Sequence, residues 1–396
     1  MKQTKVFVSL LSQLPVEMKL LLEFINTNID KNKIDNYKKK DINWEKFYQL
    51  ALHHRVIPLL YNNLNKMKPI WIPSLVTDNL QTKYRENVFL MLQLTSQMES
   101  IAKLFNENTI EALFLKGPTL GKELYGDISL RTSKDIDILI SPRDIKRIQK
   151  LLLENGYKEK EETGFILNEH KWRTHHTVFY HPNSKFSIEI HWRLNDRPDI
   201  EPPFNCLWER RRVTYLTKEP ISILGEEDLF LYLISHGARH GWFRIRWLVD
   251  IERFLQRGIE WERLNPIIKE YSNEHVVGQS MILTNHLLNT PINREFSFLL
   301  SNKVNKLASF AMKIIKSIEY DQPFPKELIP LHRKYSWKLQ KNIWQKIKFF
   351  MVSSYPSYKD YQVFQLPKSL HFLYFFLRPF LYTGRKLGLL KVNENG

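Results

Sequence analysis

Two aspartates one residue apart stand in an otherwise apolar run near the middle of the chain. Asp135 and Asp137 are separated by Ile136 and followed by the apolar residues 138–140. Side chains alternate between the two faces of a strand, so both carboxylates lie on the same face. Like charges so close repel each other unless a cation lies between them. Since Mg²⁺ prefers a few carboxylates plus phosphate oxygens, the pair is a candidate holder of a metal-bound nucleotide. For the pair alone, two solvated aspartates at a strand edge are the simpler interpretation.

A third lone carboxylate stands in a later apolar segment. Glu189 lies between two isoleucines and shares its strand face with His191. If a neighbouring strand brings Glu189 beside Asp135 and Asp137, three carboxylates can hold two metal ions about 3.5–4 Å apart. We therefore predict these three acids as catalytic residues and metal ligands, with Mg²⁺ or Mn²⁺ as the cofactor. An ordinary outward-facing strand residue is the alternative interpretation of Glu189.

A glycine stands where an expected strand, 110–115, runs into an expected helix that begins at Pro118. The N-terminus of a helix attracts anions, and glycine lets the backbone approach a phosphate closely. Lys116 and Arg131 can offset phosphate charge. These features predict Lys116, Gly117 and Arg131 as nucleotide-binding residues. A solvated lysine at a strand end is the alternative for Lys116.

The whole pattern resembles that of the polymerase-β-like nucleotidyltransferase superfamily, which combines a glycine-containing strand–helix turn, a D-x-D strand and a later strand acid. More narrowly, it resembles a bacterial family of uncharacterised nucleotidyltransferases. The resemblance covers about residues 40 to 260 and rests on Leu115-Lys116-Gly117, Tyr125, Arg131, Asp135-Ile136-Asp137, Glu189-Ile190-His191-Trp192 and Trp247-Leu248-Val249-Asp250. It implies metal-dependent transfer of a nucleoside monophosphate from an NTP to a hydroxyl or phosphate of an unidentified acceptor, which can be a small molecule, a peptide or a protein.

Further polar residues are secondary candidates for contacting the acceptor or supporting the metal ligands. His236 and His240 lie four apart on an expected helix, a spacing that can bind zinc, but no glutamate follows His236 as the zinc-protease motif requires. In the resembling family this segment borders the active-site cleft, which implies roles for both histidines, Arg244 and Asp250. His191 is a candidate because it shares the face of Glu189. Buried, hydrogen-bonded histidines are the alternative interpretation.

The periodicity of the chain predicts four regions. Helical patterns fill residues 1–107 and return in 201–330, whereas 108–200 alternates strands and helices and contains a hairpin turning at Pro182-Asn183-Ser184. A basic, aromatic-rich tail occupies 331–396. The order strand, helix, strand, helix, strand, strand predicts an α+β fold. We expect a small mixed β-sheet nucleotidyltransferase core flanked by N-terminal and C-terminal helical regions.

Charge favours polyanionic partners. Lys and Arg number 59 against 42 Asp and Glu, a formal charge of +17. The tail alone carries twelve Lys or Arg against Asp360 and Glu394, with aromatic residues interleaved. Such a mixture suits an anionic membrane surface or a nucleic-acid groove. The alternative to an enzyme is therefore a catalytically idle relative that binds nucleic acid or a membrane through its tail, and the alternative for the tail is a helical layer packed on the protein.

Cysteine content and targeting signals indicate the cellular compartment in which we expect the protein. Cys206 is the only cysteine, so the chain can form no internal disulfide and no multi-cysteine metal site. The start of the sequence lacks a cleavage site, and no apolar stretch reaches the roughly 20 residues that span a bilayer. We expect a cytoplasmic protein that can also lie peripherally at a membrane. Walker A, G-x-G-x-x-G and G-x-S-x-G motifs are absent from the sequence.

Overall fold

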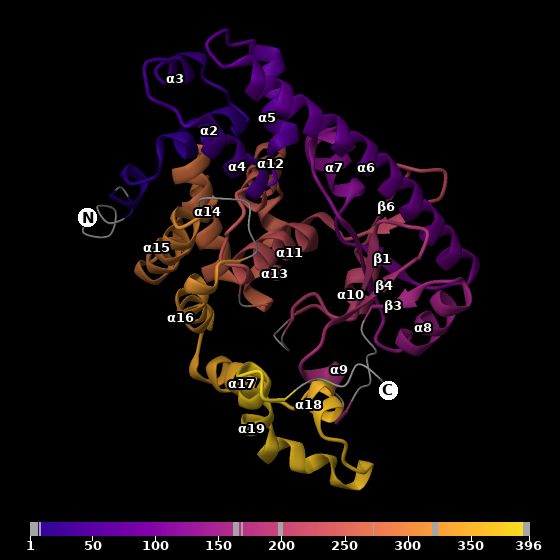
Figure 1. The fold of residues 1–396 in the computed structure, drawn as a ribbon. Helices are drawn as coiled ribbons and strands as arrows, with labels where there is room; N and C mark the ends of the chain where they lie inside the picture. Colours follow the sequence, from indigo (N-terminus) through magenta and orange to yellow (C-terminus); the bar gives the residue numbers. More distant parts are fainter. Residues whose placement is uncertain are drawn as a thin grey trace. The chain divides into compact units, whose positions relative to one another are not determined.

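The computed structural model describes residue 7 and residues 9–160, 166–167, 169–196, 201–271, 273–318 and 324–390 (Figure 1). The chain divides into two compact units, each built from two separated segments. Unit 1 comprises Met1–Ile136 and Asn205–Leu339, and unit 2 comprises Asp137–Phe204 and Gln340–Gly396. Residues 391–396 of the predicted tail and residues 1–6 lie outside the described residues. The division of the sequence into four regions stays a prediction.

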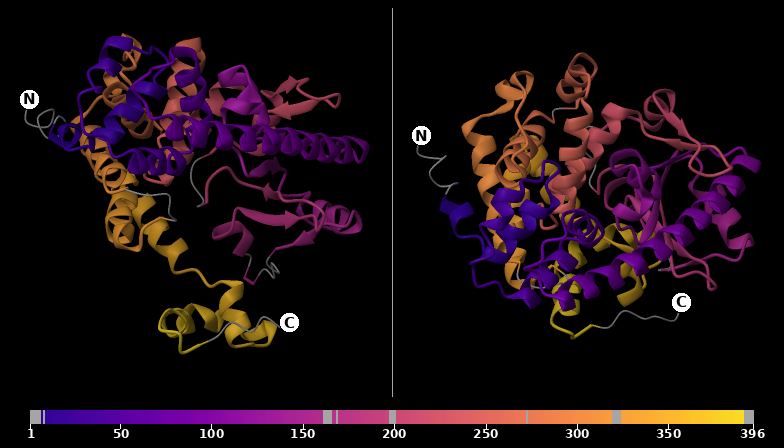
Figure 2. Two further views of the ribbon diagram at one scale, coloured as in Figure 1. Left: turned by 45° about the horizontal axis from the view of Figure 1, so that its top comes forward. Right: turned by 90° about the horizontal axis from the view of Figure 1, so that it is seen from above.

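The first segment of unit 1 is mainly helical. Asn43 begins α4 by accepting a hydrogen bond from the backbone N–H of Lys46, 3.0 Å away. The 34-residue helix α6 is the long purple helix of Figures 1 and 2. The elements are α2 (Val16–Ile25), α3 (Lys31–Asp35), α4 (Trp44–His53), α5 (Ile57–Met67), α6 (Ser74–Glu107), β1 (Ala112–Phe114), α7 (Pro118–Tyr125) and the 3₁₀ helix η1 (Ile128–Leu130).

The second segment of unit 1 packs three helices, α11, α12 and α14, against one another. Trp242 is fully buried in this core, where its indole Nε1 donates a hydrogen bond to Gln279 at 3.2 Å. Helices α14 and α15 lie side by side in Figure 1. The elements are α10 (Phe204–Glu209), β6 (Arg212–Thr214), β7 (Ile221–Ile223), α11 (Glu226–Arg239), α12 (Arg246–Arg257), α13 (Trp261–Glu270), α14 (Glu274–Leu288), η2 (Arg294–Leu299), α15 (Asn302–Lys316), η3 (Lys326–Leu328) and α16 (Ile329–Leu339).

Unit 2 contains a β-hairpin and the helices that end the described chain. The C-terminal helices share a small core in which Ile166, Tyr374 and Leu381 are buried. Asp360 is fully buried there between Arg378 and Arg385, with N···O distances of 2.5 and 2.6 Å. The elements are α8 (Ile145–Glu154), β3 (Lys158–Glu159), α9 (Glu169–Trp172), β4 (His176–Tyr180), β5 (Ser187–His191), α17 (Ile343–Ser353), α18 (Tyr358–Val363), η4 (Lys368–Leu373) and α19 (Tyr374–Lys386).

The strands form one mixed seven-stranded sheet in the order β3-β4-β5-β2-β1-β7-β6, where β2 is Asp135–Ile140. Strands β4 and β5 are antiparallel, with His176 opposite His191 and Val178 opposite Glu189. Strand β1 pairs with β7 in parallel. The predicted α+β class, the D-x-D strand and the hairpin are confirmed. Strands β6 and β7 were not expected, because three residues are too few to show an alternating pattern.

The length and hydrophobicity of the helices bear on whether any of them can span a membrane. Among the described residues, no helix is both long and apolar enough to cross a membrane.

Candidate functional site

Two acids and a histidine converge in unit 2, and we call Asp137, Glu189 and His191 the carboxylate site. Asp137 lies on β2, and the other two residues lie on β5, the neighbouring strand in the sheet order. Nε2 of His191 is 3.3 Å from Oδ1 of Asp137 and 3.3 Å from Oε2 of Glu189. One ligand atom from each residue lies within 4.8 Å of the others. The imidazole therefore lies between two carboxylates.

Strand alternation explains why these side chains meet. Ile188 and Ile190 are 0% and 1% exposed, so one face of β5 belongs to the core. Glu189 and His191 necessarily lie on the other face. On β2, Ile136 and Ile138 are likewise buried and leave Asp137 on the opposite face. Asp137 itself is only 2% exposed, so its charge must be offset within the protein or by a bound cation.

The charges of the site support one another. Burial lowers the pKa of His191, but hydrogen bonding to Asp137 and Glu189 outweighs it, so the net pKa is raised above the usual value. Burial raises the pKa of Glu189, but its hydrogen bond with His191 helps to bring the net pKa below the usual value. The imidazolium thus occupies the place that a metal cation can take between the two carboxylates.

The donor set fits a divalent cation. Carboxylate oxygens are the ligands that Mg²⁺ and Mn²⁺ prefer, and Asp137 and Glu189 supply them from two neighbouring strands. His191 can either join them as a ligand or hold them in place. Among the described residues, Asp135 is outside both groups of converging ligand atoms, and it lies two residues before Asp137 on the half-buried start of β2. Its predicted metal-ligand role stays a prediction.

A second charged group lies in unit 1, and we call Lys116, Arg131, Arg239, Arg246, His236 and His240 the cationic region. Gly117 ends the approach to α7 with φ of 84°, a left-handed value that glycine adopts without strain. Pro118 occupies the first turn of α7, as predicted from the sequence. The ammonium group of Lys116 lies 5.7 Å from the ring centre of Tyr232 on α11.

Burial and neighbouring cations together depress the pKa values of the two histidines of the cationic region. Burial lowers the pKa of His236 far below its usual value, and the charges of Lys116, Arg239 and Arg246 lower it further. Burial and then the charges of Arg239 and Lys116 lower the pKa of His240 to about 3. Both imidazoles are therefore neutral near pH 7, and Nδ1 of His236 accepts a hydrogen bond from Arg239 at 3.2 Å. A potential that expels protons is one that attracts anions.

Asp250 accepts hydrogen bonds from two side chains of unit 1. Arg131 donates two hydrogen bonds to its carboxylate, from Nε at 3.0 Å and from an Nη at 3.1 Å. The hydroxyl of Tyr125 donates to the same carboxylate at 2.7 Å. Burial and then the carboxylate of Asp250 raise the pKa of Tyr125 well above its usual value. Arg246 donates to the carbonyl of Thr132. This network fixes the segment between α7 and β2 to α12.

The structure thus sorts the predicted site residues. Asp137, Glu189 and His191 come together, as do Lys116, His236 and His240 with their neighbours. Arg131 and Asp250 are partners of each other, while Arg244 donates to the carbonyl of His53 at 2.9 Å. Sequence reasoning missed Arg239, whose only signal was its place between the two histidines. The predicted roles of all these residues in binding and catalysis stay predictions.

Comparison with known proteins gives one match. The model of a family described as "Uncharacterised nucleotidyltransferase" matches residues 40–289. No curated protein matches the chain, and no solved structure matches it. The matched range contains every residue of the carboxylate site and of the cationic region.

Proposed function

The chain belongs to the family of uncharacterised nucleotidyltransferases, and from this premise we propose that it moves the nucleoside monophosphate group of an NTP to an oxygen of an acceptor. The single observation that carries the proposal is the carboxylate site, in which two buried or half-buried acids converge on neighbouring strands. The acceptor oxygen belongs to a hydroxyl or a phosphate of a small molecule, a peptide or a protein.

In this proposal the side chains bind and orient the reactants. Asp137 and Glu189 hold Mg²⁺ or Mn²⁺, with Asp135 as a further ligand. When bound, the divalent cation offsets the negative charge of the phosphates. His191, between the two carboxylates, keeps them in position. The acceptor oxygen forms a bond to the α-phosphorus, and a hydroxyl acceptor releases its proton to water. The bond from that phosphorus to the bridging oxygen breaks, and pyrophosphate leaves with the electron pair.

The cationic region is proposed to bind the triphosphate. Lys116 lies beside the N-terminus of α7, where backbone N–H groups attract anions. The depressed pKa of His236 and of His240 supports a positive potential there. Arg131 acts in part through Asp250, since its guanidinium already donates twice to that carboxylate. We therefore assign direct phosphate contact first to Lys116 and the backbone after Gly117.

The test follows label from the nucleotide to the acceptor. The full chain is incubated with each α-labelled NTP, Mg²⁺ and a cell extract separated into small-molecule and protein fractions. Transfer of label to one fraction, with release of pyrophosphate, is the expected result. Asp137→Asn should abolish the transfer, whereas Asp144→Asn should retain it, because Asp144 precedes α8 outside the carboxylate site. Label transfer that survives Asp137→Asn would contradict the proposal.

A second candidate function concerns the C-terminal helices of unit 2. Trp344, Phe376 and Phe380 are 75%, 72% and 75% exposed. On α17 the exposed apolar side chains fall at positions 343, 344, 347, 350 and 351, which lie along one side of a helix. Asp360 is the only acid among residues 340–390, and it is buried between two arginines. The exposed surface of these helices therefore combines apolar and cationic groups, as membrane-surface helices do.

We propose an anionic bilayer as the partner of this surface. Each lysine near an anionic surface contributes about 1 kcal/mol, so Lys346→Gln with Lys348→Gln should weaken binding to phosphatidylserine vesicles about 30-fold. The matched control replaces Lys38 and Lys39, two exposed lysines of unit 1, and should leave binding unchanged. Equal loss in both double variants would indicate non-specific attraction. Preference for RNA or DNA over vesicles at the same salt concentration would favour the nucleic-acid alternative.

A further inference from the structure

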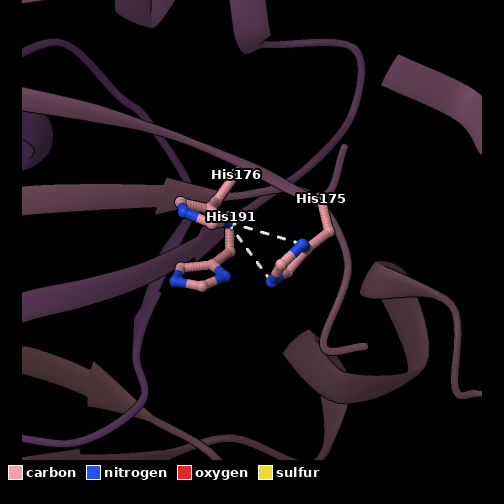
Figure 3. Close-up of side chains that lie close together, drawn as sticks. All are labelled: His175, His176 and His191. Atoms are coloured by element: carbon pink, nitrogen blue, oxygen red, sulfur yellow. Dashed lines mark hydrogen bonds between the residues drawn. The ribbon is translucent and has the colours of Figure 1, made fainter. Parts of the chain in front are cut away.

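Three histidines converge beside the carboxylate site in unit 2. His175 directly precedes β4, His176 begins β4, and His191 ends β5, where it is directly opposite His176. Figure 3 shows the three rings gathered together. Their ring centres are 4.4 Å (175–176), 5.0 Å (176–191) and 5.4 Å (175–191) apart. One ligand nitrogen from each lies within 4.8 Å of the others.

The nitrogen separation between His175 and His176 matches that around a tetrahedral metal. With metal–nitrogen bonds of about 2.0–2.1 Å, two ligand nitrogens of a tetrahedral site are about 3.3–3.4 Å apart. Nδ1 of His176 is 3.4 Å from Nδ1 of His175 and 3.2 Å from its Nε2. A His–His hydrogen bond also explains this one distance. It does not explain why a third, buried imidazole lies beside the pair.

His191 has the arrangement of a metal-bound histidine. Its Nε2 faces the carboxylates of Asp137 and Glu189 at 3.3 Å. Both ring nitrogens are buried, and the side chain is only 5% exposed; Nε2 has these two ion-pair contacts, and Nδ1 has no hydrogen-bond partner among the described residues. Histidine ligands usually donate their second ring N–H to a carboxylate, which fixes the ring and strengthens the ligand. His191 therefore has its supporting carboxylates in place and a nitrogen left for a metal.

A cavity adjoins the histidines and leaves room for a fourth ligand. Its volume is about 380 Å³, and His175, His176, Arg173 and Asp196 are among the residues that line it. Sites with three histidines and one open position hold a water molecule or a substrate group on the metal. Carboxylates beside the site add negative charge that favours a cation.

We propose that His175, His176 and His191 bind one transition-metal ion of the Zn²⁺ class, with the fourth position open to the cavity. His191 binds it through Nδ1 while Nε2–H stays on the carboxylates. Three imidazoles suit Zn²⁺, Co²⁺, Ni²⁺ or Cu²⁺ rather than Mg²⁺, which prefers oxygen ligands. The site shares His191 with the carboxylate site but binds its metal through ring nitrogens rather than carboxylate oxygens, and it does not depend on nucleotide transfer.

The test measures metal binding by the full chain without an affinity tag, since a polyhistidine tag would itself bind the metal. Chelator-treated protein is titrated with Zn²⁺ in a calorimeter, and Co²⁺ is added separately to record the visible absorption of a tetrahedral complex. One equivalent should bind. His176→Ala should lower the Zn²⁺ affinity at least about 100-fold, and His175→Ala should act similarly, because each removes a ligand. His181→Ala, in the same hairpin, should change nothing.

Two variants separate this site from the carboxylate site. Asp137→Asn removes a supporting carboxylate and should lower the Zn²⁺ affinity about 10-fold, less than the loss of a histidine ligand. Folding of each variant is checked by circular dichroism. No stoichiometric Zn²⁺ binding by the folded wild type would overturn the proposal. So would unchanged affinity in His175→Ala and His176→Ala together with full loss in Asp137→Asn, because the metal would then lie on the carboxylates.

Discussion

In unit 2, carboxylates gather around one imidazole, whereas in unit 1 guanidinium groups gather around one carboxylate. Asp137 and Glu189 flank His191, while Arg131 and Arg246 share the surroundings of Asp250. Burying an excess of either sign is costly unless a partner offsets it. The comparison shows two charge imbalances of opposite sign in one chain. A metal cation would offset the first and a polyphosphate the second.

The two regions also differ in how far apart in the sequence their residues lie. The carboxylate site is built from neighbouring strands by alternation alone. The cationic region depends on α7 and on α11 and α12, which follow α7 by about a hundred residues of sequence. Arg131 and Asp250, for example, are 119 residues apart. Perturbed titratable groups of this kind concentrate at functional sites, although structural networks also produce them. The variants below are chosen to separate those two origins.

The largest effect is expected for Asp137→Asn. The change keeps the shape of the side chain and removes one of the two carboxylates that flank His191. Charge stabilisation by a metal is worth several kcal/mol, so label transfer from NTP should fall by at least about 100-fold. The apo fold should stay intact with a limited loss of stability, because His191 loses one ion-pair partner but keeps Glu189. Rates of transfer and thermal unfolding are measured on the same sample. Full activity would remove Asp137 from the mechanism.

Asp250→Asn should have its largest effect on stability. Breaking a buried ion pair costs about 3–5 kcal/mol, because Arg131, only 2% exposed, keeps its charge without the carboxylate. Urea denaturation measures this loss. Glu107→Gln is the control, since Glu107 forms an exposed pair with Lys103 at 3.9 Å, and its loss should cost less than about 1 kcal/mol. Equal effects of the two variants would show that the Arg131–Asp250 pair does not hold unit 1 together.

The two regions were not equally predictable from the sequence. Alternation in 135–140 and 185–194 is enough to predict both strands and to put Asp137 and Glu189 on the faces opposite their isoleucine neighbours. Hairpin register would also have placed His176 opposite His191, but the histidines were interpreted singly. By contrast, no local pattern indicates that Arg131 pairs with Asp250. Strands β6 and β7 are three residues each, and β7 joins β1 from 109 residues later, with Phe114 opposite Ile223. Such long-range pairing leaves no periodic signal.

Lys116→Ala should weaken nucleotide binding and spare the fold. Losing a charge-assisted contact costs about 1.5–3 kcal/mol, so the affinity for a non-hydrolysable NTP should fall about 10- to 100-fold. Lys122→Ala, which removes an exposed lysine of α7, should leave the affinity unchanged. Calorimetry is repeated in EDTA. There the effect of Lys116→Ala should persist and that of Asp137→Asn should vanish, because only the latter depends on a metal.

If Lys116→Ala binds nucleotide as tightly as the wild type, the cationic region is a structural network. If the loss of affinity caused by Lys116→Ala disappears in EDTA, Lys116 acts on nucleotide only when a metal is bound. The cationic region and the carboxylate site would then not act independently in nucleotide binding.

The smallest effect concerns a second buried acid of α12. Glu252, two residues after Asp250, is 1% exposed, and its Oε1 accepts a hydrogen bond from the backbone N–H of Thr27 at 3.3 Å. Burial raises the pKa of Glu252 to about 7. The hydrogen bond from Thr27 and the charge of Arg253 lower this pKa, but by less than burial raises it. The folded chain therefore holds this proton more tightly than the unfolded chain. The stabilisation is complete below the unfolded pKa of about 4.3 and is lost as the pH rises through about 7.

Glu252→Gln should flatten this part of the pH dependence. In the wild type, Glu252 alone makes the free energy of unfolding fall by up to about 1.4 kcal/mol per pH unit between pH 5 and 7. Buried histidines such as His240, with a pKa lowered to about 3, act in the opposite direction. Such a histidine gains a proton in the unfolded chain but stays neutral in the fold, so lowering the pH destabilises the fold. The difference between variant and wild type at each pH isolates Glu252. The difference should be smallest at pH 5 and favour the variant at pH 8. A difference independent of pH would show that Glu252 is ionised in the fold and balanced by charge.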